Sequence, residues 1–192
     1  MAGKDRSFDP RRLDLPLFCR QAALLQGDWP QAGFTRLQDS LHPLPGDRLP
    51  PPVHWQAQGE QRPVTGGEPE LWLHLRAETE VVLQCQRCLQ PSTEALALDR
   101  RLRFVRGEDE AARLDEDSED DVLALQPRTD LHELLEDELI LALPLVPMHA
   151  HCPQPLVVEP EPLAAAAATS GPGQERPHPF AALGALRRPP KG

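Results

Sequence analysis

Aromatic side chains are scarce in this chain: they make up 4% of its 192 residues, and tyrosine is absent. A hydrophobic core therefore has to be built mainly from Leu, Val and Ala. No apolar run approaches the ~18 residues of a membrane span, and the N-terminal MAGKDRSFDP lacks the apolar stretch of a secretory signal. The sequence also has no phosphate loop, dinucleotide fingerprint or nucleophile elbow. These absences predict a cytoplasmic protein that is not an enzyme.

Cysteine is infrequent, with four residues at Cys19, Cys85, Cys88 and Cys152. Thiols stay reduced in the cytosol, so the sequence predicts no disulfide framework. Cys19 lies in an apolar segment, and we interpret it as a small buried core residue.

Proline and acidic residues are abundant by contrast. The 23 prolines make up about 12% of the chain, against an average of about 5%. Their distribution favours a compact body over residues 8–152, followed by a Pro/Ala-rich linker over 153–177. Residues 178–192 predict an amphipathic, basic segment, because Phe180, Leu183 and Leu186 have helical spacing ahead of Arg187 and Arg188. The net charge of −10 fits a basic protein partner better than naked RNA, and DNA binding is not expected.

Period-two alternation gives the clearest prediction of secondary structure. Apolar residues alternate with polar ones over 71–83, and shorter runs of the same kind cover 53–58 and 93–105. The simplest arrangement is an antiparallel meander with Cys85-Gln86-Arg87-Cys88 at a hairpin tip. Residues 107–121 carry nine carboxylates, and we expect a flexible acidic insert there because like charges repel.

Helices are expected on either side of the meander. Residues 130–143 have apolar side chains at three-and-four spacing, Thr129 or Asp130 as a cap and Pro144 as a stop. Their acidic residues, including Glu136 and Glu138, are interpreted as a solvated face. Residues 13–25 predict a short strand or turn followed by a helix that Gly27 ends, and residues 34–37 predict a short strand. The predicted fold is α+β, a small antiparallel meander packed against one or two helices.

The pair Cys85 and Cys88 has three competing interpretations. The two thiolates are half of a zinc site that Cys152 completes with His149, or with His151 as the alternative ligand. A redox pair is less favoured, because renewed alternation after Pro91 leaves no helix at Cys88. A purely structural role without metal stays open, with Arg87 pointing outward to an RNA phosphate or a carboxylate.

Three segments together resemble the YceD family of large ribosomal RNA subunit accumulation proteins. They are Cys85-Gln86-Arg87-Cys88, the run Glu136-Asp137-Glu138-Leu139-Ile140-Leu141-Ala142-Leu143-Pro144, and Pro179-Phe180-Ala181-Ala182-Leu183. The resemblance implies a non-enzymatic role in the synthesis, processing or stability of 23S rRNA. Many relatives carry several cysteines after the helix, where this chain has His149, His151 and Cys152.

The resemblance and the acidic charge together predict a partner in ribosome assembly. We expect a ribosomal protein or a large-subunit assembly intermediate, with 23S rRNA or its precursor as the alternative partner. A zinc-binding or thiol-active module or enzyme that uses Cys85 and Cys88 is the competing hypothesis for function.

Overall fold

The computed structural model describes residues 8–44, 46 and 48–153. The predicted basic segment over 178–192 lies outside these residues, as does the predicted linker except for Pro153. Within the described part of the chain, no helix is long and apolar enough to cross a membrane.

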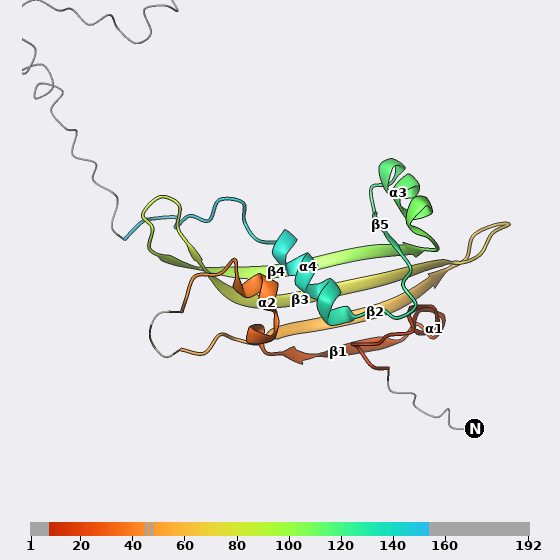
Figure 1. Cartoon of the computed structure of the whole chain (residues 1–192), viewed down its shortest axis with the longest axis horizontal. Coiled ribbons are helices and arrows are strands. Elements are labelled where there is room, and N and C mark those ends of the chain that lie inside the picture. Colours follow the sequence, from red (N-terminus) through yellow and green to blue (C-terminus); the bar gives the residue numbers. More distant parts are fainter. Residues whose placement is uncertain (1–7, 45, 47, 154–192) are drawn as a thin grey trace, which may run out of the picture. The chain divides into compact units, whose positions relative to one another are not determined.

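A five-stranded sheet forms the centre of the described residues (Figure 1). Its strands follow the order of the chain: β1 (Leu24–Trp29), β2 (Val53–Arg62), β3 (Glu70–Gln84), β4 (Pro91–Val105) and β5 (Asp121–Ala124). The first four pair antiparallel, and β5 adds to β4 as a parallel edge strand that the sequence pattern did not predict. The predicted α+β fold with an antiparallel meander is therefore confirmed.

The longest pairing joins β3 to β4 and places the hairpin tip where the cysteines are. The register runs from Leu71 opposite Phe104 to Gln84 opposite Pro91. Successive side chains of a strand point to opposite faces, so Leu73, Leu75 and the residues in phase with them share the buried face. The residues between Gln84 and Pro91 are left to form the turn.

Three helices, α1 (Leu15–Arg20), α2 (Thr35–Gln38) and α4 (Leu131–Leu141), pack with this buried face (Figure 1). In α4, Leu131, Leu135 and Leu139 are fully buried; they are four residues apart and belong to the apolar face that predicted the helix. Asp130 caps α4 as expected, since its side chain accepts hydrogen bonds from the backbone N–H groups of His132 and Glu133. The helix ends at Leu141, shortly before Pro144.

The acidic face of α4 is not simply solvated, which corrects one expectation. The side chains of Glu136 and Glu138 are only 7% and 9% exposed. Glu136 accepts backbone hydrogen bonds from Arg36 (2.6 Å) and Leu37 (3.2 Å), in the first turn of α2, where Phe34 provides no side-chain cap. Glu138 pairs with Arg100 on β4. Both carboxylates thus tie α4 to neighbouring elements.

The segment before β2 differs from its prediction in two places. The first helix ends at Arg20, and Leu24–Trp29 is a strand in which Gly27 lies against the indole of Trp55 instead of ending a helix. Residues 34–37 are not a strand: Phe34 and Leu37 are both fully buried at the i, i+3 spacing of a helical turn.

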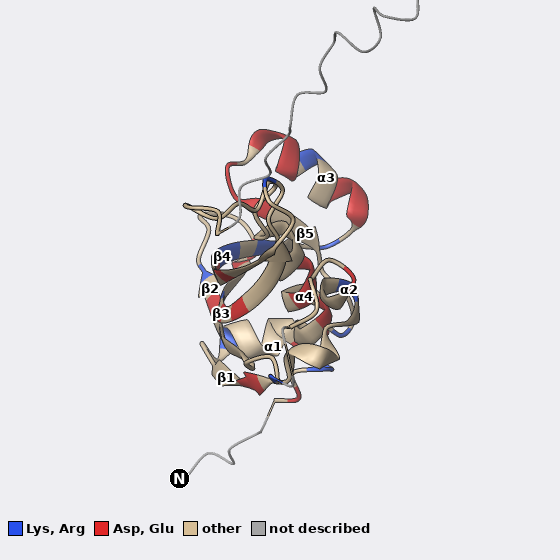
Figure 2. Cartoon of the chain, turned by 90° about the vertical axis from the view of Figure 1, so that its left-hand side faces the viewer, with Lys and Arg blue, Asp and Glu red and all other residues tan. Residues whose placement is uncertain are grey.

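The acidic stretch over 107–121 is also more ordered than expected. It contains α3 (Glu108–Asp117), and Asp121 begins β5. Glu108, Asp109 and Glu110 occupy the first turn, where the helix dipole favours negative charge. Asp115 accepts a hydrogen bond from Val122 N–H (3.0 Å), so one of the repelling carboxylates instead joins the helix to the edge strand. Figure 2 shows how Asp and Glu residues predominate along α3.

Candidate metal centre

The turn between β3 and β4 holds Cys85 and Cys88 in a tight conformation. The Cys85 N–H donates to the Gln90 carbonyl (3.0 Å), and the Leu89 N–H donates back to the Cys85 carbonyl (2.8 Å). Leu89 has a positive φ of 60°, a value that closes a turn but is unusual for a residue with a β-carbon. The two thiols are therefore fixed by the backbone of the turn.

The segment that leaves α4 runs back to this hairpin tip. Its Pro147 carbonyl accepts a hydrogen bond from the Gln86 N–H (2.9 Å). The guanidinium of Arg87 donates to the His149 carbonyl (2.8 Å) and to the Cys152 sulfur (2.9 Å). These contacts bring two segments more than sixty residues apart in sequence side by side. We call residues 144–153 the arm.

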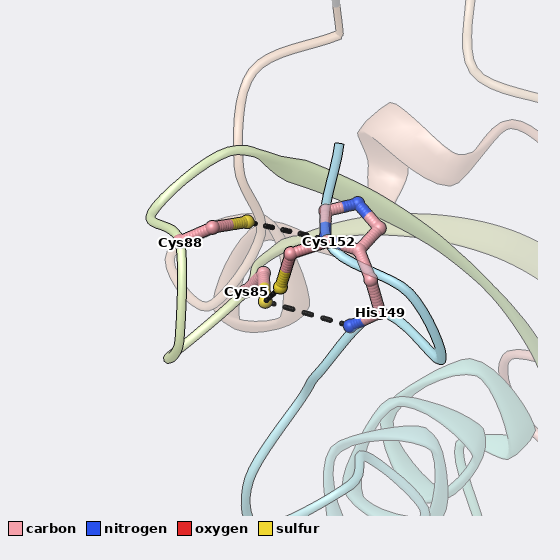
Figure 3. A group of neighbouring side chains, drawn as sticks. All are labelled: Cys85, Cys88, His149 and Cys152. Carbon is pink, nitrogen blue, oxygen red and sulfur yellow. Dashed lines mark hydrogen bonds between the residues drawn. The ribbon is translucent and has the colours of Figure 1, made fainter. Parts of the chain in front are cut away.

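Four potential ligands meet where the arm crosses the hairpin tip (Figure 3). One atom from each of Cys85, Cys88, His149 and Cys152 lies within 4.8 Å of the others. The Sγ atoms of Cys85 and Cys152 are 3.9 Å apart, and the Cys88 Sγ lies 3.4 Å from the His149 Nδ1. Tetrahedral zinc with Zn–S of about 2.3 Å and Zn–N of about 2.0 Å requires edges of roughly 3.8 and 3.5 Å. The two measured edges match these values.

The imidazole of His149 is oriented as a metal ligand would be. Its Nε2 lies 3.0 Å from the Pro91 carbonyl, which can only accept, so Nε2 carries the proton in this hydrogen bond. The lone pair is then left on Nδ1, the atom that faces Cys88. Metal-bound histidines characteristically donate their other ring N–H to a carbonyl or carboxylate in this way.

The two cysteines of the hairpin tip differ in acidity. Burial raises the pKa of Cys85, but hydrogen bonds from the backbone N–H groups of His149, Cys88 and Arg87 outweigh burial and lower the pKa to about 5. Burial, and the neighbouring sulfurs of Cys152 and Cys85, raise the pKa of Cys88. The cluster therefore loses its first proton readily and resists losing the next, unless a cation compensates the accumulating negative charge.

The cysteines and histidines outside this cluster lie in other surroundings. His151 is exposed, and the group of four within 4.8 Å contains His149 instead. Cys19 is buried in the core, as expected, with its thiol 3.2 Å from the Trp72 carbonyl. Burial raises the pKa of Cys19 to about 11, so this thiol stays protonated.

Arg87 has a role that the sequence interpretation missed. It was expected to point outward to a phosphate or a carboxylate, but it contacts Cys152 and the His149 carbonyl. The interaction with Cys152 raises the pKa of Arg87. The position of Arg87 between Cys85 and Cys88 was a signal in the sequence that this cation could contact a thiol. The position of the arm was needed to identify Cys152 as that thiol.

Comparison with known proteins identifies the family. The sequence profile described as large ribosomal RNA subunit accumulation protein YceD matches residues 73–187. A Haemophilus influenzae protein of the same name is 37% identical over 120 residues, which cover 59% of this chain and 63% of the relative, less than two thirds of its length. No solved structure matches the chain. The profile covers both the hairpin tip and the arm, and the chain belongs to the YceD family.

Proposed function

We propose that this protein supports the accumulation of 23S rRNA in the large ribosomal subunit as a non-enzymatic assembly factor. The observation that carries the proposal is the family match over residues 73–187, which includes every member of the Cys/His cluster. The relative from Haemophilus influenzae bears the name of this role. In this proposal the protein acts in the cytoplasm, where it contributes binding and not catalysis.

The surroundings of the buried carboxylates support a non-enzymatic role. General acid and base catalysis requires carboxyl groups that face a substrate. Glu136 instead accepts hydrogen bonds from two backbone N–H groups of α2, and Glu138 is paired with Arg100. These contacts explain why both groups are buried without invoking a reaction.

A zinc clip is the second part of the proposal, with Cys85, Cys88, His149 and Cys152 as ligands. The two edges that match a tetrahedral site and the orientation of His149 support this set, and leave His151 out of it. Bound zinc would supply the positive charge that allows all three sulfurs to ionise. The residues of this chain supply the geometry, because the hairpin tip and the arm are already joined by the hydrogen bond from Gln86 N–H to the Pro147 carbonyl and by those of the Arg87 and His149 side chains.

The proposed partner is a basic ribosomal protein or an assembly intermediate that contains one. The acidic residues of α3 and the overall charge of −10 support this choice, since opposite charge speeds association and selects partners. Direct binding of 23S rRNA is the alternative. It predicts an affinity that falls steeply with salt, because each phosphate contact releases counterions.

Deletion of the gene, followed by complementation, tests the proposal in cells. We expect less 23S rRNA in the deletion strain, recovery with the natural protein, and sedimentation of the tagged protein with precursors of the large subunit. Normal 23S rRNA levels, together with a protein that never enters these fractions, would refute the role. Complementation with His149→Ala tests the clip, and His151→Ala is the matched control because that side chain is exposed.

A further inference from the structure

Two sulfurs of the cluster lie close enough for a second kind of chemistry. Cys85 Sγ and Cys152 Sγ are 3.9 Å apart, and they come from the two segments that the cluster joins. We infer that Cys85 and Cys152 are an oxidation site, at which a peroxide converts the two thiols into a disulfide and displaces zinc. This inference deepens the zinc clip of the proposed function and depends on it for the displacement step.

The contacts that hold the two segments together do not depend on sulfur or on metal. They are the hydrogen bonds from Gln86 N–H to the Pro147 carbonyl (2.9 Å), from Arg87 to the His149 carbonyl (2.8 Å) and between His149 Nε2 and the Pro91 carbonyl (3.0 Å). The two sulfurs therefore remain neighbours when zinc leaves. A disulfide has an S–S length of about 2.05 Å, which small side-chain movements could reach from the observed separation.

Access and surroundings indicate the order of events. Cys85 is fully buried, whereas Cys152 is partly exposed and lies 2.9 Å from the Arg87 Nε. A small peroxide in solution therefore reaches Cys152 first. Cys88 is less suited to resolve the oxidised sulfur, because its Sγ is directed at the His149 Nδ1 (3.4 Å). Cys19 lies in the core and takes no part.

The reaction balances with hydrogen peroxide as the oxidant. The Cys152 sulfur attacks the peroxide, the O–O bond breaks, and Cys152 sulfenic acid and one water are formed. The Cys85 sulfur then attacks the sulfenic sulfur, the S–O bond breaks, and a second water leaves as the disulfide forms. The two sulfurs lose two electrons in total, and one peroxide gains them. In the zinc-bound form both sulfurs are thiolates, so the two waters also take up two protons from solvent. A dithiol reductant reverses the step by thiol–disulfide exchange.

Zinc and the disulfide exclude each other at this site. Oxidation removes two of the four ligands, and Cys88 with His149 cannot complete a tetrahedral set alone. The hairpin tip and the arm nevertheless stay joined, now by a covalent bond. The site thus exchanges a metal clip for a covalent one and releases its zinc.

Peroxide treatment of the zinc-loaded full chain tests the inference. A chromogenic chelator follows released zinc, free thiols are blocked with iodoacetamide, and non-reducing peptide mapping identifies the linked cysteines. We expect zinc release in proportion to a Cys85–Cys152 linkage, with both reversed by dithiothreitol. A Cys85–Cys88 linkage, or zinc release with only irreversibly oxidised cysteines, overturns the inference while leaving the clip intact.

Two variants and a metal-free preparation make the test specific. Cys88→Ser should keep the Cys85–Cys152 linkage, and Cys152→Ser should abolish disulfide formation. The assignment is contradicted if the Cys85–Cys152 linkage disappears from a folded Cys88→Ser chain while Cys152→Ser still forms a disulfide between other cysteines. A natural chain that binds no zinc but forms the Cys85–Cys152 linkage shows that the clip is wrong and that the oxidation site stands.

Discussion

The two histidines of the arm provide the sharpest test of the proposed metal centre, because only one of them joins the cluster. His149→Ala removes the Nδ1 that faces Cys88 and the hydrogen bond to the Pro91 carbonyl. His151→Ala removes an exposed imidazole from the same segment, two residues away. We therefore expect zinc-dependent stability to be lost in the first variant and kept in the second.

The size of the effect follows from linkage between binding and folding. Zinc that binds only the folded chain raises the free energy of unfolding by about 2.7 kcal/mol when free zinc is 100-fold above the dissociation constant. For a folded body of this size, about 1 kcal/mol corresponds to roughly 2–4 °C in melting temperature. Chelation should thus lower the melting temperature of the natural chain by roughly 5–11 °C, as differential scanning calorimetry with and without EDTA can measure.

The comparison has a clear pattern of results. The EDTA-dependent shift should fall close to zero in His149→Ala and stay at its natural value in His151→Ala. Elemental analysis should find about one zinc per chain in the natural protein and in the control. The reasoning fails if EDTA does not change the melting temperature of the natural chain, or if His151→Ala loses the shift and His149→Ala keeps it.

Three further predictions concern the fold. Glu136→Ala leaves two backbone N–H groups of α2 without their acceptor and should cost roughly 2–4 kcal/mol in urea unfolding; exposed Glu133→Ala should change stability by under about 0.5 kcal/mol, and equal losses would contradict this account. Gly59→Ala should cost about 1–3 kcal/mol, because its β-carbon would lie 2.7 Å from the ring of Phe18; an unchanged urea midpoint would refute this packing argument. Burial raises the pKa of Glu138 above its ordinary value, so the folded state holds the carboxyl proton more tightly than the unfolded state, and the stability that this group contributes falls as pH rises from its unfolded to its folded pKa. Glu138→Gln should remove this pH dependence from urea unfolding between pH 4 and 7, and an unaltered profile would exclude Glu138 as the source of the dependence.

Much of the sheet and of the cluster was predictable because the signals are local or chemical. Period-two alternation predicted β3 and the long part of β4, and leucine spacing with an Asp130 cap predicted α4. The cluster was predictable because cysteine is infrequent here, and because cysteine and histidine suit the same metal. Both arguments use residue types and short spacings, which can be read directly from the sequence.

The remaining features depend on partners far away in the sequence. Glu136 is buried because the first turn of α2, a hundred residues earlier, needs an acceptor. Gly27 is a strand residue because β1 pairs with β2, where Trp55 lies opposite it and its indole leaves little room for a side chain. Asp115 joins α3 to β5 through Val122, in a stretch whose charge alone favours disorder. Local pattern cannot reveal such contacts, since either half appears ordinary without the other.

The contacts of the arm explain why the cluster can exist before any metal binds. Pro144 follows the end of α4, and the Pro147 carbonyl accepts a hydrogen bond from the Gln86 N–H of the hairpin tip. In small zinc-dependent domains the metal supplies the folding energy, and removal unfolds the chain. Here the sheet and helices bury their own core, and the Pro147 and His149 carbonyls of the arm accept hydrogen bonds from the Gln86 N–H and the Arg87 guanidinium. Loss of zinc should therefore leave the sheet intact and act first on the arm, which makes the proposed exchange between metal and disulfide reversible.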